Sequence, residues 1–580
     1  MASEELVTEQ FQLLGIHVER EVLIKCVSIC EDNSVDAETF IERWMAFSLN
    51  HLNSASPTLE NLDLLSRKEF SKRASERPNA PAKDASRIST GTTLTVYGAP
   101  TTAQLDSNVL SNYMTTTPKR VKVEPDLVPD KTELCPITYS PTTGKSAKYA
   151  SRGNQGIVVH SYGDQKLLED LSHQNNLLDT LSLNITQVPN EDGDVYTKAM
   201  FGFELLHEKA SIYDNHISYL SQCIMQKAGI TETSSTRHKT QTEVWVCGRI
   251  ECDADARLNP KCVVLQGTWE HSLSQTVPVD LDNLKQYSLF PGQVVVMRGT
   301  NPRGDRFVAH EVLCDAARPV PDHNADIMNT LQGKMSMIFA AGPYTTSDNM
   351  SYEPFKDLVS YIAFHRPHVA VLAGPFMDCD HTKINDNSMA ETYKSFFEKL
   401  MDSLAALQTT SPFTKIYIVA SQKDAFHVNI YPTPPYSTRR KHQNIFFMPD
   451  PCTLNVNGVI VGVTSTDVLM HISQEEISLG TVGDKQSRLA GHMLAQQSYW
   501  PLLSPALAAD AALWTAHAQL HATPHLLLLP SNFRYCIKEV NGCVVVNPEH
   551  LTKGLSGGTF ARLHITGGEK LNVAAQILRI

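Results

Sequence analysis

The segment from Met335 to Tyr344, MSMIFAAGPY, is a short and mostly apolar run that stops at a Gly-Pro turn. The same pattern returns at 369–376, VAVLAGPF, and a third run, KIYIVA at 415–420, stops at a polar turn. Helical periodicity separates the runs, at about 353–365 and about 389–407. Short apolar runs that alternate with helices predict parallel strands buried inside an open α/β sheet. Ligands of such sheets bind beyond the carboxyl ends of the strands, so the three turns mark the candidate site.

These turns resemble a degenerate form of the motifs of calcineurin-like metallophosphoesterases. In that family the successive strands end in D-x-H, G-D-x-x-D and G-N-H-D/E, a G-H-x-H follows later, and the residues hold two metal ions. The corresponding positions in this chain are Gly342, Tyr344, Gly374, Pro375, Asp378, Gln422, Lys423, Asp424 and Asn532. Only Asp378 and Asp424 keep a carboxylate, and Lys423 adds a positive charge where the family has a histidine. The resemblance therefore implies an inactivated phosphoesterase domain, residues 319–580, with no metal and no cofactor.

Two plainer interpretations of these positions stay open. A glycine followed by proline ends a strand in many proteins without any ancestral site. Three such turns in order, with strands and helices between them, favour the phosphoesterase interpretation. Asp378 on its own is more typical of a turn or capping residue than of a surviving metal ligand.

Five short alternating segments between 237 and 318 predict an OB-fold β-barrel, with a helical piece between the third and fourth strands. We group residues 156–318 with this barrel. Its candidates for stacking and gripping single-stranded nucleic acid are Trp245, Trp269 and Phe307 together with Arg249, Arg298 and Arg306. The acidic chain favours the other interpretation, in which the aromatic residues belong to the core and the arginines to a solvated edge.

The first 155 residues have two parts. Residues 1–73 carry four short amphipathic segments and predict an N-terminal helical bundle of a kind that docks other proteins. Residues 74–155 are rich in Ser, Thr and Pro without a lasting period, which predicts a disordered linker. Within it, Thr117 and Ser140 each precede a proline and are candidate phosphorylation sites. Phosphate on Thr117 would mask the basic cluster 118–122.

The bulk composition limits the functions that the chain of 580 residues can have. A protein that grips nucleic acid normally carries a basic domain, whereas the net charge here is −12, which argues for protein partners and for weak or absent direct DNA binding. The sequence has neither a signal peptide pattern nor an apolar run of membrane length. Its twelve cysteines form no CxxC pair. We therefore expect a soluble intracellular chain with reduced thiols and no membrane partner.

An OB barrel joined to an inactivated phosphoesterase domain resembles the B subunits of the eukaryotic replicative DNA polymerases. Within that group the chain is most similar to the B subunits of DNA polymerase α–primase, in the segments AGPYTTSD at 341–348, AGPFMD at 373–378, GVTSTD at 462–467, NPEHLTKG at 547–554 and GGTFARL at 557–563. The resemblance implies a non-catalytic subunit of the nucleus that tethers the zinc-containing C-terminal region of the catalytic subunit. It also implies that the chain works beside the primase subunits in replication initiation and primer synthesis, and that its N-terminal module recruits other replication proteins.

Three functions are therefore compared: a structural polymerase subunit, an active metal-dependent phosphodiesterase or 3′ nuclease, and an independent single-strand-binding module. Hydrolysis of a phosphodiester with Mn²⁺ separates the second function from the first. A steep salt dependence of single-stranded DNA binding would mark the third. The degenerate motifs favour the first.

Overall fold

The computed structural model describes residues 20–33, 40, 44, 57, 61–62, 65, 146–164, 166–169, 185–187, 201–254, 256–321, 334–386, 389, 391–503, 507–567 and 571–580. The chain divides into two units, Met1–Asp130 and Lys131–Ile580. Among the helices in the described ranges, not one combines the length and the apolar character that a membrane crossing requires.

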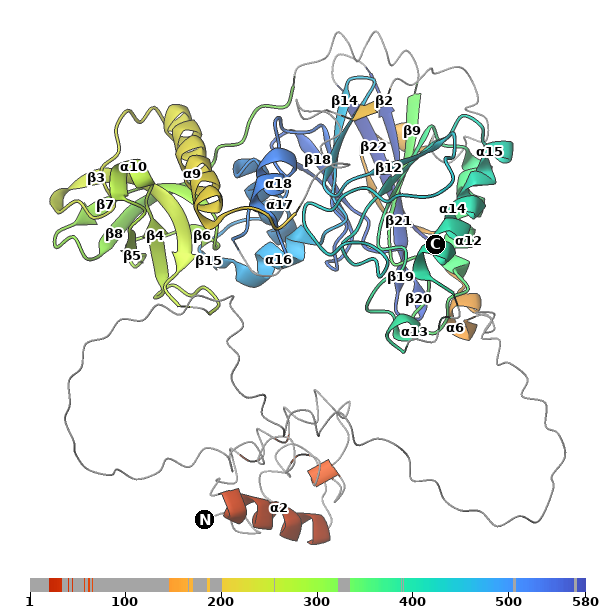
Figure 1. Cartoon of the computed structure of the whole chain (residues 1–580), viewed down its shortest axis with the longest axis horizontal. Coiled ribbons are helices and arrows are strands. Elements are labelled where there is room, and N and C mark those ends of the chain that lie inside the picture. The colour runs from red at the N-terminus through yellow and green to blue at the C-terminus, as the bar shows by residue number, and fades with distance from the viewer. Residues whose placement is uncertain are drawn as a thin grey trace, which may run out of the picture. The chain divides into compact units, whose positions relative to one another are not determined.

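The described helix of the first unit is α2, Arg20–Asn33, drawn in red in Figure 1. Its buried residues Val22, Cys26, Ile29 and Cys30 follow one another at intervals of one to four, so they share one face of the helix. α2 corresponds to the second of the four predicted helical segments. Apart from single positions, the other three segments lie outside the described residues, as do the candidate phosphorylation sites Thr117 and Ser140.

The predicted barrel is confirmed: five strands close on themselves in the order β3-β4-β5-β8-β7. The strands are β3 (Thr240–Cys252), β4 (Val263–Gln266), β5 (Thr276–Asp280), β7 (Val294–Asn301) and β8 (Phe307–Leu313). Successive side chains of a strand point to opposite faces. Alternate residues such as Val246 and Ile250 therefore point inward and pack around Phe307 in the barrel core.

The helical piece of the barrel is not where the sequence predicted it. Between the third and fourth barrel strands the chain forms a turn and the short strand β6, Tyr287–Leu289, whereas the short helix α10, Trp269–Ser272, lies between the second and third. The prediction was wrong because Leu281 and Leu284 enter the barrel core from a turn. In addition, β6 pairs with β15, Ile477–Leu479, a distant strand that no local pattern reveals.

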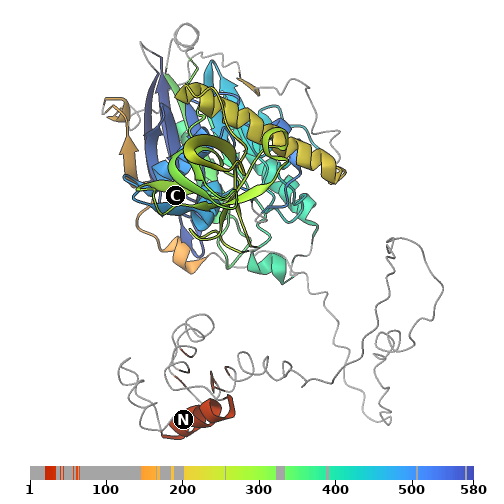
Figure 2. The same ribbon diagram turned by 90° about the vertical axis from the view of Figure 1, so that its left-hand side faces the viewer.

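A long helix, α9 (Leu206–Ala228), lies along the outside of the barrel, as Figure 2 shows. Ile217, Leu220 and Ile224 are spaced by three and four residues, so they form one stripe of the helix. This stripe packs against Val296 and its neighbours on β7. The packing fixes the helix to the barrel.

Two strands that we grouped with the barrel region pair elsewhere. β1, Val158–Tyr162, pairs with β22 at the edge of one large sheet, and β2, Ile185–Gln187, pairs with β13 at the edge of the other. The short helix α6, Ala147–Ala150, lies inside the stretch 74–155 that was expected to be a linker, and its Tyr149 is buried. Neither strand belongs to the barrel.

The C-terminal part is built from two β-sheets that pack face to face. The first has the order β1-β22-β21-β9-β10-β11-β12, with β9 (Lys334–Ala341), β10 (Val369–Ala373), β11 (Lys415–Val419), β12 (Ile445–Met448), β21 (Thr559–Thr566) and β22 (Asn572–Arg579). Strands β9 to β12 are parallel, as predicted for the first three, and β21 runs antiparallel to β9. The second has the order β17-β18-β16-β14-β13-β2, with β13 (Cys452–Val456), β14 (Val459–Val463), β16 (Leu526–Leu528), β17 (Cys536–Val540) and β18 (Cys543–Asn547).

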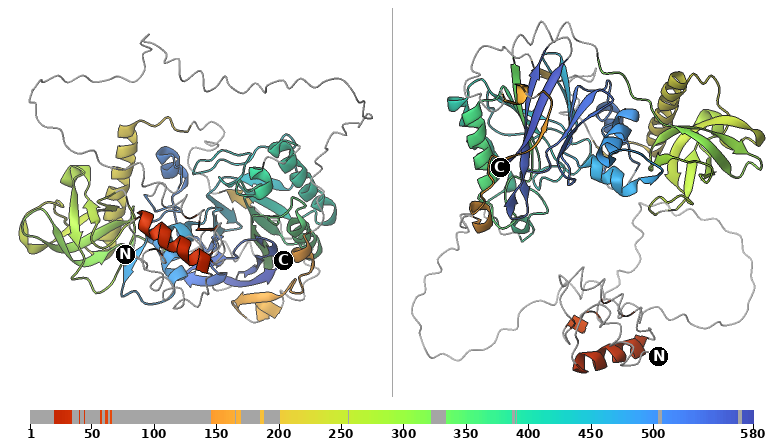
Figure 3. Two further views of the ribbon diagram at one scale, coloured as in Figure 1. Left: turned by 90° about the horizontal axis from the view of Figure 1, so that it is seen from below. Right: turned by 180° about the vertical axis from the view of Figure 1, so that it is seen from behind.

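Helices cover the outer face of each sheet, which gives four layers (Figures 1 and 3). The first sheet is covered by α12 (Glu353–His365), α13 (Thr382–Asn385), α14 (Tyr393–Ala405) and α15 (Leu407–Thr410). The second is covered by α16 (Val468–Glu475), α17 (Lys485–Ala495) and α18 (Ala511–His517). A minor hairpin, β19 (Thr552–Lys553) and β20 (Ser556–Gly557), follows β18. The core between the sheets consists almost wholly of aliphatic side chains.

Polar contacts tie the barrel to the helices of the second sheet. Glu476 forms two hydrogen bonds with Arg488, at 2.8 and 2.9 Å, and accepts another from Ser288 beside the barrel. Burial favours the neutral form of Glu476, but these hydrogen bonds outweigh it and hold its pKa below the usual range. The side chain of Gln496 bonds to both the N–H and the carbonyl of Val294, at 2.7 and 3.1 Å. Barrel and sheets are therefore one connected scaffold.

Candidate functional site

The strand ends that the sequence singled out meet at one edge of the first sheet. The N–H of Gly342 donates to the carbonyl of Ala373 at 2.9 Å, and the N–H of Gly374 donates to that of Val419 at 3.0 Å. A Cβ on Gly342 would lie 1.9 Å from the carbonyl oxygen of Pro375. Glycine is required there because the ends of β9 and β10 pack backbone against backbone and leave no room for a side chain.

Aromatic rings fill the space in front of these strand ends. Tyr344 is fully buried, and its ring stacks on Phe376 with the centroids 4.6 Å apart. Its hydroxyl donates toward the carbonyls of Ala340 and Ala373, at 3.1 and 3.0 Å. Tyr436 meets the edge of Phe376, with the ring centroids 6.2 Å apart. Position 344 therefore contributes packing to the site.

Asp424 is enclosed by the same strand ends. Its Oδ1 accepts hydrogen bonds from the N–H groups of Phe376 and Met377, at 2.8 and 2.5 Å, and its Oδ2 accepts one from the Tyr436 hydroxyl. Burial raises the pKa of Asp424 to about 7, even though these hydrogen bonds favour the ionised form. Both carboxylate oxygens already have donors from the chain itself.

The other polar positions of the predicted site are closer to the surface. Asp378 is half-buried and its Oδ1 accepts the N–H of Asp380 at 3.0 Å, as a turn residue does. Gln422 is half-buried and Lys423 is exposed. Within the described ranges, the group able to offer three metal ligands is Asp378, Cys379 and Asp380, whose ligand atoms lie within 4.8 Å of one another. These are consecutive residues of one turn and not ligands gathered from several strand ends.

A late segment closes over the end of β9. The N–H of Leu551 donates to the last carbonyl of that strand at 2.8 Å, and the Nδ1 atom of His550 lies 2.6 Å from the carbonyl oxygen of Gly342. Burial lowers the pKa of His550, so its ring is neutral at neutral pH and Nδ1 carries the donated proton. Asn532, which was expected at this site, is exposed, and its N–H donates to Asp467 at 2.8 Å.

Sequence reasoning missed a second buried carboxylate, Asp450, which follows β12. It accepts hydrogen bonds from the hydroxyls of Thr464, Ser465 and Thr466 at 2.7 to 2.8 Å, and from the N–H of Ser465 at 2.8 Å. Burial raises its pKa against the effect of these bonds. The available signal was the run of three hydroxyl residues at 464–466. The carboxylate links the end of β12 to the end of β14, and so one sheet to the other.

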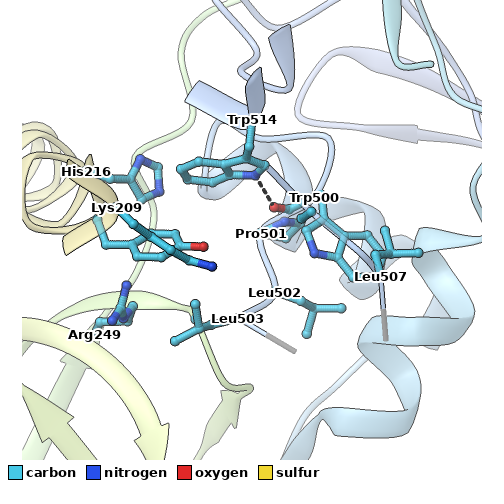
Figure 4. A pocket seen from close by; sticks show the side chains of 12 residues that line it. Lys209, His216, Arg249, Trp500, Pro501, Leu502, Leu503, Leu507 and Trp514 are labelled. Carbon is cyan, nitrogen blue, oxygen red and sulfur yellow. Dashed lines mark hydrogen bonds between the residues drawn. The ribbon is translucent and has the colours of Figure 1, made fainter. Parts of the chain in front are cut away.

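A cavity of about 280 Å³ lies between α9, the barrel and the stretch of chain that runs from the end of α17 into α18, and Figure 4 shows its lining. Lys209 and Tyr213 line it from α9, Arg249 from β3, and Trp500 and Trp514 from the opposite wall. The indole N–H of Trp514 donates to the carbonyl of Trp500 at 2.9 Å. A second hollow of about 330 Å³ shares Lys209, Tyr213 and Arg249, so the two hollows form one groove along α9.

Exposed apolar side chains gather beside this groove. They belong to the start of α9 and to α10, their exposed fractions run from 56% to 87%, and we call them the α9–α10 patch: Phe203, Leu205, Leu206, Trp269 and Leu273. Leu206 itself lines the second hollow. Monomeric proteins rarely expose large apolar residues together, so these residues are a candidate binding surface.

The backbone under the patch is held in place. Glu204 accepts hydrogen bonds from the N–H groups of Ala511 and Ala512 at the start of α18, at 3.0 and 3.1 Å. On the other side, the N–H of Trp269 donates to Asp214 of α9 at 2.7 Å. The patch is thus a fixed surface that is attached to both the barrel and the second sheet's helices.

Comparison with known proteins explains this combination of parts. Three families match in succession: the N-terminal region of the DNA polymerase alpha B subunit over residues 4–72, the OB domain of the same B subunit over 210–315, and the B subunit of DNA polymerases alpha and epsilon over 337–538. The DNA polymerase alpha B subunit of Mus musculus is 32% identical over 610 aligned positions, which cover 100% of both chains. The chain belongs to the family of DNA polymerase alpha B subunits.

Other members of the family are similar to different extents. The DNA polymerase alpha B subunit of Drosophila melanogaster is 31% identical over 100% of both chains. That of Saccharomyces cerevisiae is 24% identical over 62% of this chain and 59% of the relative. As a member of this family, the chain is an accessory subunit of DNA polymerase alpha, with a mixed α/β fold that includes an OB domain.

The six residues of the OB domain that were candidates for stacking and gripping nucleic acid divide between the core and the surface. Phe307 is fully buried in the barrel, which confirms the core interpretation for this residue. Arg249 is buried and pairs with Glu251 at 2.7 Å, and Arg298 pairs with Glu311 at 3.0 Å. The favoured interpretation was wrong for Trp269, which is 64% exposed and not in the core, and for Arg249, which is buried and not on a solvated edge. Trp245 is half-buried and Arg306 is exposed. Arg249 and Arg298 are neutralised by the chain's own carboxylates.

Proposed function

We propose that the chain is a non-catalytic tether, which holds the catalytic subunit of DNA polymerase alpha by the zinc-containing C-terminal region of that subunit. Its own phosphoesterase-like domain binds no metal. The observation that carries this proposal is Asp424, whose two carboxylate oxygens accept three hydrogen bonds from the chain itself. A metal ion at this position would have to displace these hydrogen bonds, which already occupy both oxygens.

The architecture supports descent from a phosphoesterase. Two sheets lie face to face between helices, and Asp450 joins their strand ends at one edge. In a calcineurin-like enzyme, several strand ends there would supply Asp, His and Asn ligands to two metals. The corresponding ends here carry Gly342, Gly374 and the ring of Tyr344, which supports the loss of the metal site.

A hydrolysis assay tests the loss of chemistry. The full chain is incubated with Mn²⁺ and either a nitrophenyl phosphodiester or single-stranded DNA, and we expect no turnover above the metal alone. The alternative function, an active metal-dependent phosphodiesterase or 3′ nuclease, predicts turnover that disappears in Asp378→Ala. Turnover that persists in that variant marks a contaminating nuclease.

For the tethering surface we propose the α9–α10 patch and the groove beside it. Apolar side chains of the partner would cover Leu206 and Trp269, and tryptophan is a residue type that carries much of the binding energy in protein interfaces. Because Glu204 and Asp214 pin the patch to two parts of the fold, little ordering is required on binding.

Co-purification with the catalytic subunit tests the tether. We expect a stoichiometric complex with the full chain, and an affinity weakened by about tenfold or more in Leu206→Glu because a charge would be buried against apolar partner groups. Phe413→Glu is the matched control, since Phe413 is 72% exposed and lies outside the patch. If the two variants bind equally well, the tethering surface lies elsewhere. If the native chain forms no complex, the tether itself is wrong.

We propose further roles for this chain within the complex that it forms with the catalytic subunit. It works beside the primase subunits in the nucleus and regulates replication initiation and primer synthesis. Residues 1–73 act as a docking module for other replication proteins, and the linker 74–155 carries Thr117 and Ser140 as phosphorylation sites. Removing residues 1–145, which keeps α6 and its buried Tyr149, should leave binding to the catalytic subunit intact while it abolishes the other associations, and phosphopeptide mapping of the native chain tests the two sites.

A further inference from the structure

Two cysteines meet at the hairpin that joins the first two barrel strands. Cys252 is the last residue of β3, and Cys262 directly precedes β4. Their sulfur atoms lie 3.2 Å apart. The N–H of Asp253 donates to the carbonyl of Cys262 at 2.8 Å, so the backbone holds the two positions side by side.

The Cys262 thiol is fixed by the turn before it. Its Sγ accepts the N–H of Asn259 at 3.1 Å, and its own N–H donates to the carbonyl of Asn259 at 3.1 Å. Both thiols are half-buried, so a small oxidant can reach them. An Sγ–Sγ bond of about 2.05 Å needs an approach of only about 1.2 Å from the present separation, less than one bond length.

We propose that Cys252 and Cys262 form a reversible disulfide when the chain meets hydrogen peroxide. The thiolate of Cys252 attacks one peroxide oxygen, the O–O bond breaks, and the departing hydroxide takes up the thiol proton as water. The resulting sulfenic acid is attacked by the sulfur of Cys262, the S–S bond forms, the S–O bond breaks, and the second hydroxide leaves as water with the Cys262 proton. Two thiols are oxidised and one peroxide is reduced to two waters.

The roles of the two cysteines follow from their surroundings. Burial, together with the neighbouring thiol, raises the pKa of Cys262, and the N–H and carbonyl of Asn259 both hydrogen-bond its sulfur, so peroxide oxidises Cys252 first. Cys262 is therefore the resolving residue. In the reducing interior of a cell the pair remains open, and a thiol such as glutathione reverses the bond by exchange.

The bond would change the barrel at a defined place. It would close the loop between the first two strands, one of the loops that OB folds use to contact ligands and partners. A closed loop has fewer conformations, so oxidation would fix the shape of this end of the barrel. The pair lies on the outer end of a hairpin and is independent of the proposed tether at the α9–α10 patch.

Peptide mapping of the full chain tests the proposal. The reduced protein is exposed to hydrogen peroxide, its remaining thiols are alkylated, and it is cut with trypsin, which cleaves after Arg257 and Lys261 and so separates the two cysteines. We expect the peptides 250–257 and 262–285 to appear joined, with the loss of two hydrogens, and to separate again after reduction.

Single substitutions make the test specific. In Cys262→Ser the joined peptides should vanish, and the sulfenic acid of Cys252 should accumulate and react with dimedone. Cys314→Ser, at another half-buried cysteine of the same domain, is the matched control and should leave the joined peptides unchanged. The proposal is overturned if peroxide leaves both thiols alkylatable, or if it oxidises each to a sulfinic acid without joining the peptides.

Discussion

Replacement of Asp424 by asparagine tests whether the carboxyl group behind the strand ends is held in its neutral form. The change keeps the size of the side chain and removes its titration. Burial raises the pKa of Asp424 from 3.8 to about 7, so the native protein holds this proton more tightly than the unfolded chain does. The stability that the proton contributes is complete below about pH 4 and is lost as the pH rises through about 7.

The size of the effect follows from the shift of the pKa. A difference of about 3 units at about 1.4 kcal/mol each makes the ionised native state ~4 kcal/mol less stable, relative to the protonated one, well above pH 7. Part of that loss has already occurred at about pH 5, so the change between about pH 5 and about pH 8 is ~2.5 kcal/mol. Asp424→Asn has no such titration. Its free energy of unfolding should therefore rise by ~2.5 kcal/mol relative to the native chain over the same interval.

The free energy of unfolding of both proteins is measured by guanidinium unfolding, followed by tryptophan fluorescence, at the two pH values. Other groups titrate equally in the two proteins, so their effects cancel when the variant is compared with the native chain. Tyr436→Phe serves as a second variant. It removes a hydrogen bond that favours the ionised form of Asp424, so the titration should move to higher pH. If the difference between Asp424→Asn and the native chain is the same at both pH values, Asp424 does not titrate in this interval, and the reasoning that burial raises its pKa fails.

Three further substitutions test the packing and the attachment of the barrel. Tyr344→Phe removes the hydroxyl donor that the Ala340 and Ala373 carbonyls share, while Ala373 keeps the N–H of Gly342, so it should cost about 1 kcal/mol in denaturant unfolding, and an unchanged midpoint would contradict the assigned hydrogen bonds. Gly292→Ala should loosen the barrel, because φ is +101° and a Cβ would lie 2.3 Å from the backbone nitrogen of Leu503; faster proteolysis between the barrel and the sheets is the readout. Glu476→Gln should cost about 3 kcal/mol at neutral pH by unpairing Arg488. The native pair stabilises the fold above the unfolded pKa and loses this effect as the pH falls through the lower folded pKa, so the variant and the native chain should converge in acid.

The sequence was a good guide wherever a local pattern decides the structure. The runs before Gly342 and Gly374 predicted parallel strands because each is apolar, short and closed by a turn that only glycine fits. The barrel strands were predicted from a different local pattern, the alternation of apolar and polar residues between turns. In contrast, the segment at Tyr287–Leu289 was expected to be helical, because its partner β15 is remote in the sequence and supplies the hydrogen bonds that make it a strand.

Within the candidate site, the sequence predicted which strand ends meet, but not which side chains fill the space between them. Gly342, Gly374 and Asp424 were predicted to meet, and they do. The ring of Tyr436, which bonds to Asp424, comes from a loop with no strand or helix pattern to locate it. The α9–α10 patch was not predicted either. Leu206 and Trp269 are large apolar residues, which a sequence pattern assigns to the core, and only the fold shows that they are exposed.

The position of β21 between β22 and β9 has a consequence for the synthesis of the chain. On the ribosome, β9 to β12 emerge long before β21, so the edge of β9 stays open with unpaired backbone groups until Thr559–Thr566 has been made. During that interval the half-built sheet is a template for aggregation and a substrate for chaperones. A premature stop shortly before β21 would therefore remove few residues and yet take away both β21 and β22, which leaves β9 with an open edge and β1 without its partner, so such a truncation should be as damaging as one made far upstream.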